Sequence, residues 1–182
     1  MKFPKVSVIL TSWNNWEDTI EALESLYKVN YPNYEVIVVD NNSEDDSVKK
    51  IVDWAGGKIR VNSKFFKFDK KNKPIRCLTY TKREFETGEY LGEKKKLDKI
   101  KSDKKLFILK NDKNTNWSGS NNLAIKQVLK ENKSKYIFLF NNDAVIDKNA
   151  ITELVNVFEK GNKKIGIAGA RYTVIMLARE KM

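Results

Sequence analysis

The fold is decided between residues 6 and 40, which read VSVILTSWNNWEDTIEALESLYKVNYPNYEVIVVD. Two β-branched apolar runs, Val6–Leu10 and Glu35–Asp40, are typical of strands that are buried on both faces of a sheet. Between them, apolar residues recur at Ile20, Leu23 and Leu26 with the spacing of one helix face. A strand, a helix and a second strand joined this closely predict a right-handed βαβ unit in a parallel sheet.

The same alternation continues along the chain. We predict a helix ending at Gly56-Gly57, a strand at 106–109, a helix at about 119–131, a buried strand at 136–140, a helix ending at Gly161 and a last strand at 165–170. The sequence therefore predicts an α/β fold with a mostly parallel sheet flanked by helices. A chain of 182 residues suits a single domain, 1–182.

A Lys-rich segment, residues 61–105, interrupts this pattern. Between Arg60 and Asp112 there are 17 Lys and Arg against 8 Asp and Glu, so most of the net charge of +11 is local. Because long structureless loops are uncommon in compact domains, we expect an insertion with a hairpin around 75–81 and a helix around 93–100. Such a segment is usually a solvated surface, although its basic and aromatic residues also suit an anionic membrane or a polyanionic acceptor. No nucleic-acid-binding motif accompanies the charge, so we do not expect a nucleic acid partner.

The amino-acid composition limits the possible catalytic residues and the cellular compartment. The chain has no histidine, so acid–base catalysis must come from Asp, Glu, Lys or Tyr. The single cysteine, Cys77, excludes an internal disulfide and fits a reducing compartment. The sequence shows no signal-peptide cleavage pattern and no apolar run of the ~20 residues that span a bilayer. We expect a cytoplasmic protein, either free or peripheral at the inner face of the membrane.

Polar clusters follow four of the predicted strands, beginning at Thr11, Asp40, Asn114 and Asn141. Turns are rich in such residues, so each cluster alone is a weak signal. The carboxyl ends of parallel strands meet at one edge of a sheet, where ligands of open α/β folds bind. The recurrence of polar clusters after four strands therefore predicts a binding site at that edge.

Four segments resemble motifs of family 2 glycosyltransferases, which have the Rossmann-like, nucleotide-binding GT-A fold. These segments are Val6–Asn14, Val38–Ser43, Asn114–Asn122 and Phe140–Asp143. The resemblance covers about residues 4–58 and 106–172 and leaves the Lys-rich segment outside. It implies transfer of a sugar from a nucleotide-diphosphate sugar donor to an acceptor hydroxyl, metal-assisted and inverting, with a glycan, a lipid-linked molecule or a protein as acceptor.

The resemblance also implies roles for individual residues. Mg²⁺ or Mn²⁺ would neutralise the departing diphosphate, with Asp143 as its carboxylate ligand. Asn116 stands where the family usually has glycine, and Asn tolerates a positive φ better than most residues. The residues implied to bind the nucleotide-sugar are Thr11, Ser12, Asn14, Asp40, Asn42, Asn116, Gly119, Asn121, Asn141 and Asn142.

Other interpretations stay open. Asp40 alone also fits a turn or helix cap, Asn121 also fits a cap, and Trp13 and Trp117 are more often packing residues than sugar platforms. The family's catalytic carboxylate normally lies further along the chain, and we identify no general base here. We therefore expect that the chain is a fragment, is completed by a partner or is inactive. A nucleotide-sugar-binding module without catalysis is the alternative function.

Overall fold

The computed structural model describes residues 3–161 and 165–170. Its regular elements follow the predicted α/β alternation. They are β1 (Val6–Ser12), α1 (Trp16–Leu26), β2 (Tyr34–Asp40), α2 (Ser47–Ala55), β3 (Arg76–Thr81), α3 (Lys82–Thr87), α4 (Leu91–Asp98), β4 (Lys105–Lys110), α5 (Asn116–Glu131), β5 (Tyr136–Leu139) and α6 (Ala150–Lys160), with short 3-10 helices at Lys70–Asn72 and Ser102–Lys104. None of the described helices is both long enough and apolar enough to cross a membrane.

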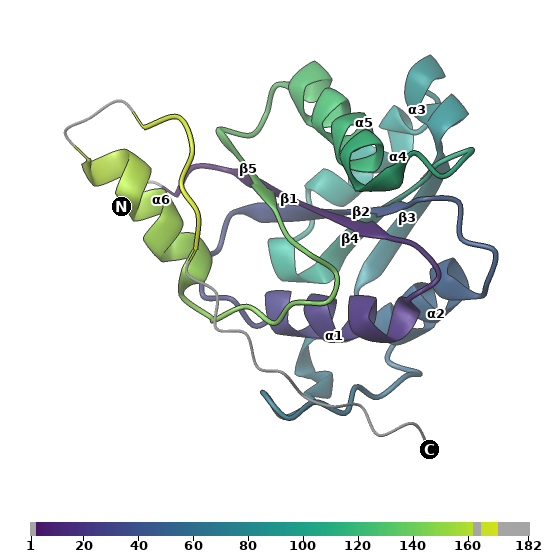
Figure 1. Ribbon diagram of the computed structural model, residues 1–182, viewed down its shortest axis with the longest axis horizontal. Helices are drawn as coiled ribbons and strands as arrows, with labels where there is room; N and C mark the ends of the chain where they lie inside the picture. Colours follow the sequence, from purple (N-terminus) through teal and green to yellow (C-terminus); the bar gives the residue numbers. More distant parts are fainter. Residues whose placement is uncertain (1–2, 162–164, 171–182) are drawn as a thin grey trace.

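Five parallel strands form one sheet in the order β3-β4-β2-β1-β5. Helices α1 and α2 cover one face, and α3, α4 and α5 cover the other (Figure 1). The central strands β1 and β2 are buried along their whole length because both of their faces are covered. The predicted α/β class with helices on both sides of a parallel sheet is confirmed.

Apolar side chains of the central strands alternate between two hydrophobic clusters. Val8 and Val36 belong to the cluster under α1 and α2, whereas Ile9, Ile37 and Val39 belong to the cluster under α3, α4 and α5. Successive strand residues point to opposite faces, so one continuous apolar run supplies both clusters. This explains why the strands carry β-branched residues without a polar face.

The Lys-rich segment contributes to the main sheet, and the predicted hairpin is wrong. Residues 76–81 form one strand, β3, which pairs in parallel with β4 at the sheet edge. A hairpin needs a turn within the segment, but β3 instead leads directly into α3, with a capping box between Thr81 and Glu84. The helix predicted at 93–100 is present as α4, two residues earlier.

Two further expectations near the end of the chain differ from the structure. The strand at 136–140 was predicted to be buried, but β5 is mostly half-buried because it pairs only with β1 among the described strands. Residues 165–170 form no strand, and Ile167 is 92% exposed. Gly166 and Gly169 weaken the strand tendency of this stretch, and no described strand pairs with it.

Buried ion pairs join the Lys-rich segment to the core. Lys94 of α4 is 1% exposed and lies 3.1 Å from Glu35 of β2 and 2.9 Å from Glu131 of α5. On the other face, Lys73 lies 2.9 Å from the fully buried Glu24 of α1. Buried charges of this kind need a partner, so these contacts fix the segment to the sheet and helices.

Candidate functional site

All four polar clusters lie at the carboxyl edge of the sheet. The strands are parallel, and their register pairs Ser12 with Asp40, and Asp40 with Lys110. The loops that follow β1, β2, β4 and β5 therefore leave the sheet at the same edge. The predicted convergence of the polar strand ends is confirmed.

The loops after β2 and β4 diverge between two neighbouring strands. The loop after β2 leads to α2 on one face of the sheet, and the loop after β4 leads to α5 on the other (Figure 1). In open α/β sheets this divergence opens a crevice in which ligands bind. The candidate site is therefore centred between Asp40 and Lys110, at the ends of these strands.

Asn41 connects the two diverging loops. Its amide nitrogen donates to the side-chain oxygen of Asn114 at 2.8 Å. Its own oxygen accepts from the Asn111 amide at 3.2 Å and from the Thr115 backbone N–H at 3.0 Å. Asn41 is 2% exposed, so these bonds replace water completely. Asn41 was not among the predicted binding residues, and only its place inside a polar strand end could have indicated it.

The loops after β1 and β2 are joined by a second set of hydrogen bonds. The backbone N–H of Asn14 donates to the Ser43 hydroxyl at 3.0 Å, and the Asn14 side-chain oxygen accepts from the Glu44 N–H at 2.8 Å. Asn14 and Asn42 both have positive φ, at 48° and 64°. Asparagine tolerates this backbone region, which explains its repeated use in these turns.

The loop after β5 reaches the same edge through Thr19 of α1. The Thr19 hydroxyl lies 2.9 Å from the Ser12 hydroxyl and accepts from the Asn142 amide at 3.2 Å. Asn141 and Asp143, on either side of Asn142, are exposed. The hydrogen bonds of Thr19, Asn14 and Asn41 thus tie all four loops into one surface.

Two buried oxygen atoms in the last residues of β1 and β2 lack a hydrogen-bond partner among the described residues. They are Oγ1 of Thr11 and Oδ1 of Asp40, on neighbouring strands. The other Asp40 oxygen accepts from the Ser43 N–H at 3.4 Å. Burial raises the pKa of Asp40 above its usual 3.8, against the opposing effects of the Ser43 hydrogen bonds and Lys110. An unsatisfied buried acceptor is costly, so this position favours a ligand that donates hydrogen bonds.

The first turn of α5 is built for close packing. Asn116 has a φ of 57°, a backbone region that asparagine tolerates better than most residues. A Cβ on Gly119 would lie 2.6 Å from the Thr115 Cβ, so only glycine fits there. Asn121 is 3% exposed and donates to the Trp117 carbonyl at 2.8 Å. Its amide nitrogen therefore serves the helix itself, and a contact with the donor stays a prediction.

Two tryptophans at this edge are exposed. Trp13 is 53% exposed and Trp117 is 51% exposed, so the interpretation of both as packing residues is wrong. Each belongs to a loop or helix start that leaves the sheet edge, where the core does not extend. Exposed indole rings beside polar loops can stack on a base or a sugar.

The edge offers oxygen ligands for a hard cation. Asp143 is an exposed carboxylate, with amide oxygens of Asn141 and Asn142 beside it in the sequence. Within residues 3–161 and 165–170, no three His, Cys, Asp or Glu side chains are grouped to hold a metal ion. Mg²⁺ and Mn²⁺ retain waters and are often bound through one carboxylate plus phosphate oxygens, so this donor set fits a cation that arrives with a diphosphate.

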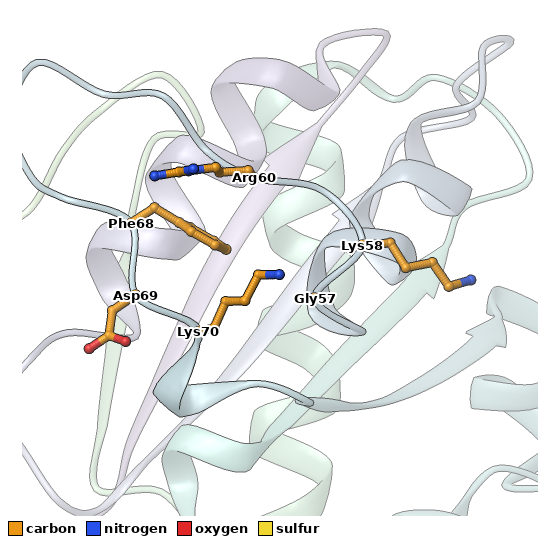
Figure 2. A pocket seen from close by; sticks show the side chains of 6 residues that line it. All are labelled: Gly57, Lys58, Arg60, Phe68, Asp69 and Lys70. Carbon is orange, nitrogen blue, oxygen red and sulfur yellow. The ribbon is translucent and has the colours of Figure 1, made fainter.

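Two open cavities of about 330 and 640 Å³ lie elsewhere, on residues 57–70, and Figure 2 shows the smaller one. None of the predicted binding residues lines either cavity. The hydrogen bonds and unpartnered oxygens, rather than cavity size, mark the sheet edge as the candidate site.

Comparisons with known proteins agree with this architecture. A sequence model described as "Glycosyl transferase family 2" matches residues 7–73 and 87–180, which leaves only 74–86 between the two matched parts. The match thus extends further into the Lys-rich segment than the resemblance of the four motifs. No curated protein matches the chain.

Solved structures show the same fold. The mannosyltransferase PcManGT from Pyrobaculum calidifontis, in complex with GDP-Man and Mn²⁺, is 18% identical with a TM-score of 0.55 over 87% of this chain. TarS of S. aureus is 19% identical with a TM-score of 0.50 over 86% of this chain. The chain spans 33% of the length of PcManGT and 20% of that of TarS.

Proposed function

Because the chain belongs to glycosyl transferase family 2, we propose that its carboxyl-edge loops bind a nucleotide-diphosphate sugar and serve sugar transfer to an acceptor hydroxyl. The unpartnered oxygens of Asp40 and Thr11 carry this proposal. Asp40 ends β2 beside the crevice and Thr11 lies on the neighbouring strand β1, and a nucleobase or ribose supplies N–H or O–H donors that would satisfy these oxygens. PcManGT, which shares the fold, is described in complex with GDP-Man.

Different loops would contact different parts of the donor. Thr11, Ser12, Asn14, Asp40 and Asn42, from the loops after β1 and β2, would surround the nucleoside. The residues of α5 and of the loop after β5 would face the diphosphate and sugar. This second group consists of Asn116, Gly119, Asn121, Asn141 and Asn142.

A divalent cation, Mg²⁺ or Mn²⁺, would be held by Asp143. When bound, it would offset the negative charge of the nucleoside diphosphate as the sugar leaves. Asn141, which carries no charge, would hydrogen-bond a ribose or phosphate oxygen. The Mn²⁺ described in complex with PcManGT supports this choice of metal.

Transfer with inversion requires an acceptor hydroxyl that attacks the anomeric carbon and a carboxylate that takes its proton. Asp40 and Asp143 are assigned to the donor and the metal, so the general base is not among the residues named here. The same loops therefore also support an alternative function, a module that binds nucleotide-sugar without transferring it.

The remaining proposals concern the whole chain. Residues 1–182 would act as one nucleotide-sugar-binding domain in the cytoplasm, where a single cysteine fits a reducing environment. The acceptor would be a glycan, a lipid-linked molecule or a protein. Contact of the Lys-rich segment with the membrane would bring the domain to a membrane-bound acceptor.

Calorimetric titration with UDP, GDP and dTDP, each with and without Mn²⁺, tests the donor site. We expect one nucleotide to bind in a metal-dependent manner, and Asp143→Asn to remove the metal dependence. Asp147→Asn is the matched control, because Asp147 is also exposed and makes the same charge change four residues away. If no nucleotide bound to folded wild-type protein, the proposal would fail.

A further inference from the structure

Residues 57–71, which we name the basic loop, form a charged surface apart from the candidate site. It contains six Lys and Arg residues and one carboxylate, Asp69. Lys58 pairs with Asp53 at 2.8 Å. The other five form no ion pair within the part of the chain that the structure describes; they are Arg60, Lys64, Lys67, Lys70 and Lys71. The loop therefore presents positive charge that the protein itself does not neutralise.

Apolar side chains hold the basic loop against the core. Val61 is 6% exposed, and Phe66 and Phe68 pack against the cluster under α1 and α2. Directly after the loop, Lys73 pairs with buried Glu24. The cations are thus carried on an anchored segment, which lowers the entropy lost when they bind a partner.

Phe65 is placed differently from its aromatic neighbours. It is 48% exposed and follows Lys64, with Lys67 two residues later. An exposed aromatic ring flanked by lysines suits the boundary between lipid headgroups and acyl chains, because long lysine side chains keep their ammonium groups among the phosphates.

Two open cavities lie on this loop. Arg60 and Phe68 line both of them. Figure 2 shows Lys70 directing its amine between Phe68 and Gly57, whereas Asp69 and Lys58 point away from the cavity. The cations that border these hollows could therefore contact phosphate groups from more than one side.

The basic loop lies far from the carboxyl edge of the sheet. Helix α2 runs back from that edge for nine residues, about 13 Å, before the loop begins at Gly57. The loop ends near the start of β3, where Arg76 pairs with Lys105, the first residue of β4. A partner bound to the loop would leave the candidate donor site uncovered.

Three other lysines of the Lys-rich segment are less available. Lys82 pairs with Asp112, Lys96 pairs with Glu93, and Lys94 is buried. We propose that the basic loop is a membrane-binding surface for a bilayer containing anionic phospholipids, with Phe65 entering the headgroup boundary. The inference rests on the membrane contact proposed above and locates it, and it does not require the sheet edge to bind a nucleotide.

Vesicle co-sedimentation tests this surface. The full chain is mixed with vesicles of phosphatidylcholine alone or with added phosphatidylglycerol, at low and high salt. We expect binding only with phosphatidylglycerol and weakening by salt. Each cation near an anionic bilayer strengthens binding about fivefold, so Lys64→Ala/Lys67→Ala should weaken it roughly 30-fold. Phe65→Ala should also weaken it, including at high salt.

The matched control is Lys95→Ala/Lys99→Ala, which removes two exposed lysines from α4 and its C-terminal end, on the other face of the sheet. Equal loss in the control would mean that binding follows net charge alone, and the proposal would be overturned. Absence of wild-type binding, or stronger binding of a short RNA through the same residues, would overturn it too. Nucleotide titration of the same variants should be unchanged, so failure here is distinct from failure of the donor site.

Discussion

The amide nitrogen of Asn41 donates to the side-chain oxygen of Asn114 at 2.8 Å, and this contact joins two loops that leave the sheet toward opposite faces. The Asn41 oxygen at the same time accepts from Asn111 and Thr115. One buried side chain thus holds both walls of the crevice where parallel sheets bind ligands. The shape of the candidate site therefore depends on a residue whose own polar atoms are hydrogen-bonded within the protein.

Replacing Asn41 by alanine should therefore affect stability as well as binding. Asn41→Ala leaves the buried Asn111 amide and Thr115 N–H without this acceptor, which should cost about 2–3 kcal/mol of unfolding free energy. Chemical denaturation measures the loss. Asn122→Ala is the control, because Asn122 is exposed and should change stability by less than about 0.5 kcal/mol. Equal stability of the two variants would contradict the role given to Asn41.

Two helical glycines offer a matched pair. A Cβ on Gly119 would meet the Thr115 Cβ at 2.6 Å, whereas a Cβ on Gly92 of α4 would meet nothing within 4 Å. Gly119→Ala should destabilise the protein by about 1–3 kcal/mol through overpacking. Gly92→Ala should stabilise it by up to about 1 kcal/mol, because alanine is the better helix former. Thermal unfolding of both variants checks the opposite signs.

The central strands could be predicted from the sequence because both faces of β1 and β2 are buried. A short continuous apolar run such as Val36–Val39, with close connections on either side, is typical of a strand buried on both faces of a parallel sheet. Strand β3 could not be assigned in this way, because its partner β4 lies about 30 residues later and no local turn marks the pairing. The burial of Lys94 could not be predicted either, because it depends on Glu35 and Glu131 from elements distant in the sequence.

The candidate site was predictable in position but not in detail. Parallel strands bring their polar ends to one edge, so Asp40 and Asn141 could be placed together before any coordinates. The hydrogen bonds of Asn41 depend on how two loops fold against each other, which no local pattern specifies. The exposure of Trp13 depends on where the hydrophobic core ends beside the loop after β1, and the local sequence does not show this.

The Lys94 ion cluster should matter for stability. Lys94 is 1% exposed and pairs with Glu35 and Glu131. Lys94→Ala leaves these buried carboxylates underpaired, which should cost about 3–5 kcal/mol of unfolding free energy. Lys96→Ala, which removes an exposed lysine two residues away, should change little. A similar small loss for both variants would show that the buried pairing is not needed.

The same substitution should change acid denaturation. Burial alone would raise the pKa of Glu35, but Lys94 and Lys5 outweigh it and hold that pKa below the usual 4.5. The stability from this shift is present above pH 4.5 and is lost as the pH falls through the lowered pKa. Without Lys94, the folded-state pKa of Glu35 should rise, so Lys94→Ala should lose less stability than wild type below pH 4.5. Parallel pH dependence of the two proteins would contradict the assignment.

Asp40 should show a conflict between stability and binding. Its carboxylate is 3% exposed, one oxygen has no partner within residues 3–161 and 165–170, and burial raises its pKa above 3.8. Asp40→Asn removes the buried charge and should raise the unfolding free energy of the free protein at neutral pH. The same change should weaken nucleotide binding, because an amide can present a donor where the ligand needs an acceptor.

The pH dependence of Asp40→Asn separates the charge effect from other causes. A carboxylate with a raised folded-state pKa destabilises the fold above that pKa, and the penalty fades as the pH falls toward 3.8. The stability difference between Asp40→Asn and wild type should therefore be largest at neutral pH and shrink on acidification through the raised pKa. Denaturation of both proteins across this range measures it. A difference that stayed constant with pH would contradict the conclusion that the buried charge of Asp40 destabilises the free protein.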